Sequence, residues 1–174
     1  VNSPAVAVLA GFSYTVPASG KVPLSLVTAG AGDLHDQALS QNSSYSQTNL
    51  ERGSAYLGRA QSGDNERALS DASVYISSNT NEAAGYVLRG KVNSALGKVQ
   101  DALDDMNKAI AIDPSGQNYC ERGRVFHESG QYDKAIGDYD KVLSMNPNDG
   151  NTFYNRALSN KAREQYKAAA REPI

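Results

Sequence analysis

The sequence predicts an all-α protein in which helical hairpins stack as a right-handed solenoid of about three and a half units, behind an irregular N-terminal lead-in. Three observations predict this fold. The chain repeats itself with a period of about 34 residues, and each period holds two amphipathic helical patterns. The composition also changes near residue 45, because residues 1–45 hold only three charged side chains. We therefore divide the chain into a lead-in, 1–45, and a repeat domain, 46–174.

The lead-in is expected to be extended chain with a short helix at Asp33–Gln41. Pro17 and Pro23 interrupt its apolar residues and argue against a central strand. The stretch Ala5–Phe12 resembles the end of a secretory signal, as in a processed remnant, but the basic residues that precede such a signal are absent. The sequence therefore favours neither a periplasmic or secreted location nor a cytoplasmic one.

The repeat is clearest in the third copy, whose frame is Tyr119, Arg122, Gly123, Ala135 and Pro147. A shift of 33 residues brings this frame onto a second copy, which reads Tyr86, Arg89, Gly90, Ala102 and Pro114. The first copy, around Arg52, and the fourth, around Arg156, keep fewer of these residues. The repeats are placed near 46–82, 83–115, 116–149 and 150–174, the last partial and capping the stack.

These residues resemble the tetratricopeptide repeat (TPR) family, although an Arg stands where the family usually has Leu. The resemblance implies a non-enzymatic adaptor or scaffold whose first helices line a concave groove for a peptide or helix of a partner protein. It also implies a setting in a bacterial envelope, pilus or secretion assembly. The alternative is a regulatory or structural subunit of a larger complex or enzyme whose catalytic part lies outside this chain.

Small and aromatic residues are expected to pack the hairpins. The first helices of the first three copies have a Gly where a Cβ would hold the paired helices apart: Gly53, Gly90 and Gly123. The second helices carry small residues at the same contact: Ala68, Ala102 and Ala135. Aromatic side chains are expected to fill the gaps between layers: Tyr86, Tyr119, Phe126, Tyr139 and Phe153. Pro114 and Pro147 are expected to end second helices.

Glu164 takes the place of a hairpin Gly in the fourth copy, so that copy is expected to continue as one long helix. Its polar outer face would carry Asn160, Lys161, Arg163, Glu164 and Lys167.

An Asp lies three residues beyond each repeat Ala, and it is the expected partner of the repeated Arg. The planar guanidinium of Arg satisfies a carboxylate with two hydrogen bonds, so such pairs would hold hairpins in register, within a repeat or across to a neighbour. The alternative is that these Arg side chains lie on solvated faces. The residues of these structural pairs are Arg52, Asp71, Arg89, Asp105, Arg122, Asp138 and Arg156.

The partner groove that the resemblance implies would be lined by one face of each first helix. Its candidate residues are Leu50, Ser54, Leu57, Val87, Lys91, Ser94, Cys120, Glu121, Arg124, His127, Glu128, Tyr154, Leu158 and Lys161. Chaperone-binding members of the family hold a peptide carboxylate with Lys, Asn and Arg. The matching places here are Leu50, Ser54, Leu88, Gln117 and Glu121, so a chaperone tail is not the expected partner.

Composition and spacing argue against several other functions. A net charge of −2 does not suit a nucleic-acid or anionic-membrane partner, and no apolar run approaches the ~20 residues of a membrane span. Cys120 is the only cysteine, which excludes an internal disulfide and a multi-cysteine metal site. Seven helical residues separate Cys120 from His127 by roughly 10 Å, too far for a catalytic pair. We expect no catalytic residue, cofactor or metal, and a protein partner.

Overall fold

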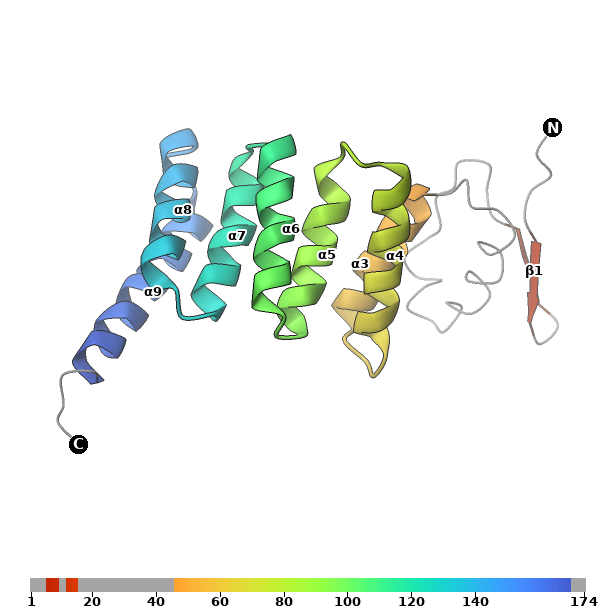
Figure 1. The fold of residues 1–174 in the computed structure, drawn as a ribbon, viewed down its shortest axis with the longest axis horizontal. Coiled ribbons are helices and arrows are strands. Elements are labelled where there is room, and N and C mark those ends of the chain that lie inside the picture. Colours follow the sequence, from red (N-terminus) through yellow and green to blue (C-terminus); the bar gives the residue numbers. More distant parts are fainter. Residues whose placement is uncertain (1–5, 10–11, 16–45, 170–174) are drawn as a thin grey trace. The chain divides into compact units, whose positions relative to one another are not determined.

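The computed structural model describes residues 6–9, 12–15 and 46–169 (Figure 1). The chain divides into two compact units, Val1–Val92 and Asn93–Ile174, and the boundary lies inside helix α5 (Ala83–Ala95). The short helix expected at 33–41 lies outside the described residues.

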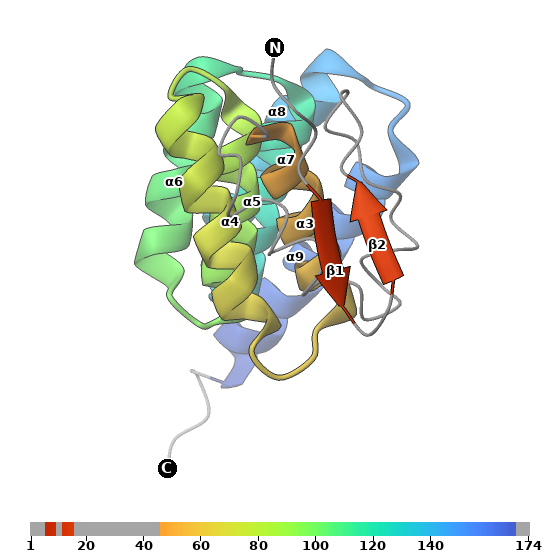
Figure 2. The same cartoon turned by 90° about the vertical axis from the view of Figure 1, so that its right-hand side faces the viewer.

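The described part of the lead-in is a small antiparallel hairpin in the first unit. Strand β1 (Val6–Leu9) pairs with β2 (Phe12–Thr15), with Val6 opposite Thr15 and Leu9 opposite Phe12 (Figure 2). Val and aromatic residues are residue types with a high propensity for strands. The sequence pattern did not predict this pairing.

Helices α3 (Ser46–Arg59) and α4 (Asp64–Ser78) form the first helical hairpin, and α5 packs against α4. A Cβ on Gly53 would lie 3.1 Å from Asp71 Cβ and 2.9 Å from Leu88 Cδ2, so this Gly allows the close approach of the helices. A Cβ on Gly85 of α5 would lie only 2.7 Å from the Tyr75 ring. The buried side chains of this unit include Tyr56, Ala68, Ala72 and Tyr75.

The turn between α3 and α4 is held by the buried carboxylate of Asp64. Arg59 donates from Nε to Oδ2 (2.8 Å) and from Nη2 to Oδ1 (2.6 Å), and the Gln61 backbone N–H donates to Oδ2 (2.9 Å). The hydrogen bonds from Arg59 lower the pKa of Asp64 to about 2, against the opposing effect of burial. The folded state therefore favours the ionised form of Asp64.

The depressed pKa predicts how the stability depends on pH. An unfolded Asp has a pKa of about 3.9, so Asp64 stabilises the fold above about pH 4, and this stabilisation is lost as the pH falls through about 2. The free energies of unfolding of wild type and Asp64→Asn, measured in urea, should differ most above pH 5 and converge toward pH 2. Glu66→Gln, at an exposed carboxylate in the same turn of α4, is the matched control. A difference that stays constant down to pH 2 would contradict this assignment.

The second unit holds the end of α5 and helices α6 (Val99–Ile112), α7 (Gly116–Glu128), α8 (Tyr132–Met145) and α9 (Gly150–Ala169). A buried cluster joins α6 to α7, with Val99 and Phe126 packed at its edge; its members are Ala102, Leu103, Met106 and Val125. Helix α7 packs closely on α8, and α9 packs on α8 and more lightly on α7.

Left-handed glycines make the sharp turns inside the hairpins of this unit. Gly97 (φ 72°) precedes α6 and Gly130 (φ 77°) precedes α8, a conformation that a Cβ disfavours. After Gly130, the backbone N–H of Gln131 donates to the Phe126 carbonyl (2.8 Å), which closes the end of α7. Helices α6 and α8 each end two residues before a proline, as predicted.

Helix α9 is one continuous helix of 20 residues, as the sequence predicts for the fourth copy. The Asp149 carboxylate caps its start by accepting from the Thr152 backbone N–H (3.2 Å) and Thr152 Oγ1 (2.9 Å). The prediction that Phe153 fills a gap between layers is wrong, because its side chain is 44% exposed. In the described residues no second helix follows α9 to cover it.

Candidate partner-binding site

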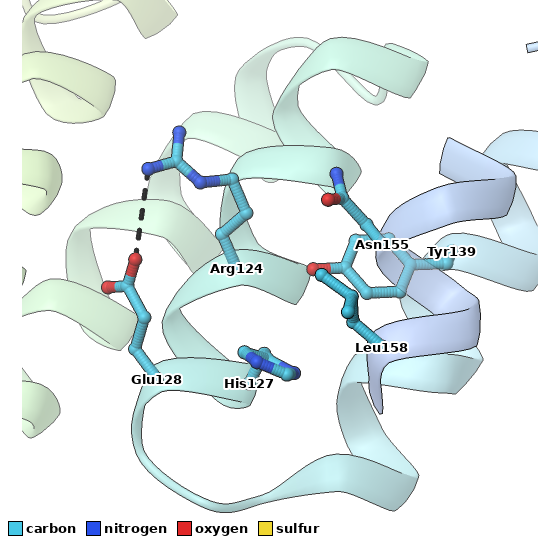
Figure 3. Close-up of a pocket in the computed structure, with 6 residues that line it drawn as sticks. All are labelled: Arg124, His127, Glu128, Tyr139, Asn155 and Leu158. Carbon is cyan, nitrogen blue, oxygen red and sulfur yellow. Dashed lines mark ion pairs between the residues drawn. The ribbon is translucent and has the colours of Figure 1, made fainter. Parts of the chain in front are cut away.

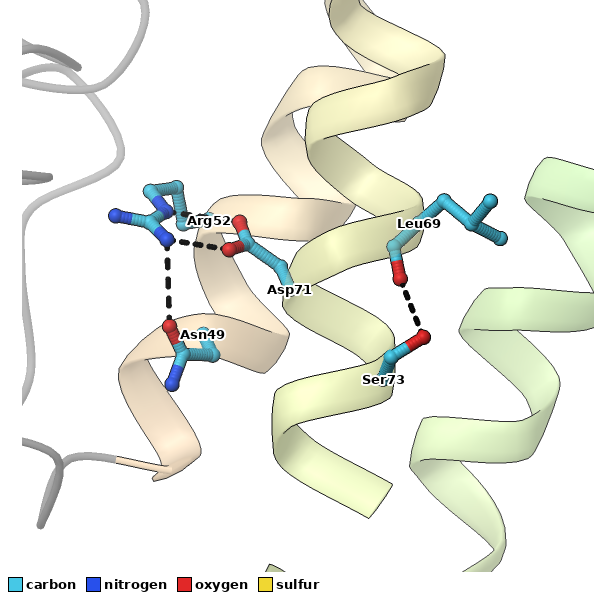
Figure 4. Close-up of polar contacts among 5 residues, drawn as sticks. All are labelled: Asn49, Arg52, Leu69, Asp71 and Ser73. Carbon is cyan, nitrogen blue, oxygen red and sulfur yellow. Dashed lines mark hydrogen bonds and ion pairs between the residues drawn. The ribbon is translucent and has the colours of Figure 1, made fainter. Parts of the chain in front are cut away.

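Two of the expected Arg–Asp pairs are bidentate ion pairs between the helices of one hairpin. In the first unit, Arg52 Nε donates to Asp71 Oδ2 (2.8 Å) and Arg52 Nη2 donates to Asp71 Oδ1, while Nη2 also reaches Asn49 Oδ1 (3.3 Å) (Figure 4). In the second unit, Arg122 Nε and Nη2 donate to the two oxygens of Asp138 at 2.8 and 2.7 Å. This fork geometry fixes α3 against α4 and α7 against α8.

The third guanidinium nitrogen of Arg122 points to the preceding hairpin. Its Nη1 donates to Asn107 Oδ1 on α6 (2.7 Å), so Arg122 links α6, α7 and α8. The hydrogen bond with Asp138 raises the pKa of Arg122, so this Arg is charged at any pH at which the protein folds.

The remaining members of the expected pairs are Arg89, Asp105 and Arg156. Arg156 Nη1 donates to Asp140 of α8 (2.6 Å), a residue that the sequence pattern did not single out. Asp105 accepts from Asn93 Nδ2 (3.2 Å) at the end of α5. Arg89 lies in the first unit and Asp105 in the second.

A partly open pocket of about 110 Å³ lies where α7, α8 and α9 meet (Figure 3). Four of the groove candidates line it, from α7 and α9: Arg124, His127, Glu128 and Leu158. The other two lining residues, Tyr139 and Asn155, were not among the candidates. Asn155 lies three residues before Leu158 on α9, so helical spacing could have identified it. Tyr139 was expected only to pack, and its ring also forms part of the pocket wall.

His127 ties α7 to α9 at the side of this pocket. Its Nδ1 lies 2.8 Å from Ser159 Oγ, and that hydroxyl donates its single proton to the Asn155 carbonyl (3.0 Å). Because a hydroxyl has a single proton, both hydrogen bonds form together when the imidazole donates from Nδ1. The ring also meets Tyr132 edge to face, with centroids 5.5 Å apart. The contact between His127 and Ser159 joins residues 32 positions apart, and no pattern in the sequence indicates it.

Charged groups of both signs surround the pocket. Arg124 is 50% exposed and pairs with Glu121 (3.1 Å) and Glu128 (3.7 Å). Glu128 also accepts from Ser94 Oγ at the end of α5 (2.9 Å). Arg124 thus keeps half of its surface free for a partner, while the two carboxylates on α7 hold it in place.

The other groove candidates of the second unit differ in how exposed they are. Tyr154 and Lys161 are exposed on α9, whereas Glu121 is buried on α7. Cys120 is half-buried, and burial raises the pKa of its thiol despite a hydrogen bond with Thr152. At neutral pH Cys120 is therefore a protonated thiol and a poor nucleophile.

In the first unit, Ser54 is the exposed candidate. The half-buried candidates there are Leu50, Leu57, Val87 and Lys91. Leu88, at one of the chaperone-clamp places, is buried against α3.

Among the described residues, no group of three or more His, Cys, Asp or Glu side chains is arranged to hold a metal ion. None of the described helices is long and apolar enough to cross a membrane.

Family comparison agrees with the repeat frame. Models of the tetratricopeptide repeat match residues 83–115 and 118–149. The chain is a tetratricopeptide repeat protein. No curated protein sequence matches this TPR protein.

Several solved structures share its fold. A thermophilic TPR protein of Thermus thermophilus has a TM-score of 0.68 and 22% identity, over 78% of this chain and 74% of that one. A MamA protein has a TM-score of 0.66 and 23% identity, over 84% and 81% of the two chains. The first TPR domain of Spaghetti (RPAP3), bound to an HSP90 peptide, has a TM-score of 0.61 and 21% identity, over 71% and 96%. These similarities confirm the predicted fold class, an all-α solenoid of helical hairpins.

Proposed function

We propose that this TPR protein is a non-catalytic interaction module that binds a peptide or helix of a partner protein along α7 and α9. The observation that carries the proposal is the pocket between these helices, with exposed Arg124 and Leu158 at its rim. The TPR fold itself supports protein–protein interaction as the general function. The comparisons give no support to a bacterial envelope, pilus or secretion setting, and the proposed function does not extend to it.

The pocket indicates the chemistry of the ligand. Its volume of about 110 Å³ is comparable with the ~150 Å³ cavity that holds a benzene ring, so it has room for one apolar side chain. Leu158 and the exposed ring of Tyr154 extend an apolar strip along α9. Arg124 offers a half-exposed guanidinium to a carboxylate or carbonyl of the same ligand. The expected ligand is a short segment with one apolar anchor next to an acidic residue.

The ligand is expected to differ from the chaperone peptide of the RPAP3 complex. The clamp of chaperone-binding members needs cations at places where this chain has Glu121 and Gln117. Glu121 is a buried acid paired with Arg124, and it would repel a peptide carboxylate there.

Truncation of the pocket rim tests the proposal. Peptides selected from a random library on the full chain would be measured by fluorescence anisotropy against wild type and Arg124→Ala with Leu158→Ala. The dissociation constant should rise about tenfold or more, because anchor contacts carry most of the binding energy. Leu158 is substantially exposed, so its truncation should change the stability by only about 0.5 kcal/mol. Arg124 pairs with the buried carboxylate of Glu121, so its truncation should cost more, and urea denaturation checks that the double variant stays folded.

The control is a second pair of an exposed cation and an exposed apolar residue, Lys141→Ala with Met145→Ala on α8. Neither residue lines the pocket, so binding should be unchanged. Equal losses in the two double variants, or no loss in the pocket variant, would contradict the proposal.

A further inference from the structure

The pocket between α7, α8 and α9 contains a buried hydroxyl that the fold itself does not use. Tyr139 of α8 is only 1% exposed, and Figure 3 shows its hydroxyl oxygen directed toward the middle of the lining residues. Within the part of the chain that the structure describes, no group forms a hydrogen bond with this oxygen. Buried tyrosine hydroxyls are normally hydrogen-bonded, so this one requires an explanation.

Two other buried tyrosines show the usual arrangement. In the first unit, the hydroxyl of Tyr75 donates to the carboxylate of Glu82, and that of Tyr86 donates to the Thr80 carbonyl (3.2 Å). These hydroxyls contribute to the fold through their hydrogen bonds. Packing explains the ring of Tyr139 in the same way, but it does not explain the hydroxyl.

The Tyr139 hydroxyl is held in place as a hydrogen-bond donor. Its ring lies against Gly123 of α7, where a Cβ would be 2.7 Å from Tyr139 Cε1 and 3.0 Å from Cζ, the carbon that bears the hydroxyl. Burial raises the pKa of Tyr139, so the hydroxyl keeps its proton at neutral pH. Tyr139 therefore presents a fixed and protonated hydroxyl to the pocket.

A second polar group of the pocket also lacks a partner. The side-chain amide of Asn155 on α9 forms no hydrogen bond with the residues that the structure describes, since Ser159 donates to the backbone carbonyl of Asn155 instead. Its amide oxygen is an acceptor and its amide nitrogen a donor. The pocket thus offers a donor from Tyr139 beside an acceptor and a donor from Asn155 (Figure 3).

We propose that the side chain entering this pocket is a tyrosine of the partner segment, whose hydroxyl accepts from Tyr139 and donates to Asn155. This inference rests on the proposed function and specifies the anchor of the same ligand. The pocket has room for one ring, and its walls include Leu158 and the Tyr139 ring, which would cover the apolar body of a phenol. A phenol combines that body with a hydroxyl that both donates and accepts.

Other anchor residues satisfy the pocket less well. A Leu or Phe anchor would cover the Tyr139 hydroxyl without giving it an acceptor, which costs binding free energy. A carboxylate would lose its hydration beside Glu128, while Arg124 is already shared between Glu121 and Glu128. A Gln amide could form the hydrogen bonds but has no ring to cover the apolar walls. The acidic residue of the ligand therefore lies next to the anchor, at the rim.

Two dipeptides that differ by one hydroxyl test the inference. They are N-acetyl-Asp-Tyr-amide and N-acetyl-Asp-Phe-amide, and their binding to the full chain would be followed by NMR shifts of the Asn155 side-chain amide. The dissociation constant of the Tyr dipeptide should be about fivefold lower than that of the Phe dipeptide, because it forms hydrogen bonds that Phe cannot. On Tyr139→Phe, this difference should fall to about twofold or less.

The variant Tyr139→Phe is also a test of what the hydroxyl does for the fold. It keeps the ring and removes only an oxygen that forms no hydrogen bond within the described residues, so its free energy of unfolding in urea should equal or exceed that of wild type. The matched control is Tyr166→Phe, at an exposed tyrosine of α9 that does not line the pocket. This control should keep the full preference for the Tyr dipeptide.

Four results would overturn the inference. They are equal binding of the two dipeptides to wild type, no binding of either at millimolar concentration, a preference for Tyr that persists in Tyr139→Phe, and a loss of stability in that variant. If the two dipeptides bind equally while the rim variant Arg124→Ala with Leu158→Ala still weakens the library peptides, the proposed function stands and only the tyrosine anchor is wrong.

Discussion

Arg122→Leu is expected to lower the free energy of unfolding by about 3 kcal/mol, although Leu is the more common residue of the family at this place. The substitution leaves the Asp138 carboxylate, only 8% exposed, without the two hydrogen bonds that Arg122 donates. Breaking one side of a buried pair costs more than the pair itself contributes, because a desolvated charge remains. Urea denaturation of the single variant measures the loss.

The double variant Arg122→Leu with Asp138→Leu distinguishes a buried ion pair from a solvent-exposed one. With both charges gone, most of the loss should be recovered, which gives a large coupling free energy. The control pair is Arg124→Leu with Glu128→Leu, whose side chains are about half exposed, and its coupling should be about 0.5 kcal/mol or less. Additive losses for Arg122 and Asp138 would show that the ion pair does not hold α7 against α8.

Gly123→Ala is expected to destabilise the protein by about 1–3 kcal/mol, although Ala favours a helix over Gly. The new Cβ would lie 2.7 Å from Tyr139 Cε1 and 3.0 Å from Cζ, closer than carbon atoms pack. Tyr139 is buried, so its ring cannot move aside without shifting α8. Thermal and urea unfolding of the variant would show the loss, and Tyr139→Leu should recover part of it.

Gly137→Ala on α8 is the matched control for this substitution. A Cβ there would meet no atom within 4 Å, and the residue is exposed in the middle of the helix. Only the higher helix propensity of Ala over Gly then acts, and the free energy of unfolding should rise by about 0.5–1 kcal/mol. If Gly123→Ala also raised the free energy of unfolding, the close contact with Tyr139 would not be the reason for a glycine at this position.

Much of the fold could be predicted because it is local and repeated. The spacing of Gly53 and Gly123 indicates where paired helices meet, and both lie at close contacts between helices. The proline spacing indicates where second helices end, and α6 and α8 end there. Helical periodicity also brought Arg124, His127 and Glu128 together as one face of α7, and all three line the pocket.

The rest depends on which helix covers which surface. Phe153 has the aromatic pattern of a buried residue, yet it is exposed, since burial requires a neighbouring helix that the pattern does not supply. Two contacts join residues on different helices: the ion pair of Arg156 with Asp140 and the hydrogen bond of His127 with Ser159. No spacing in the sequence specifies how these helices are rotated relative to each other.

The sequence by itself determined that this protein is a stack of helical hairpins of the TPR family, because a repeat period and two amphipathic patterns per period are properties of the chain. Tertiary structure alone decided that Arg122 also reaches Asn107, and that Tyr139 and Asn155 complete a pocket. It also decided that α9 presents Arg156 and Phe153 outward. The physical reason is that a repeat specifies its own helices, whereas exposure and pairing depend on the neighbours that pack against them.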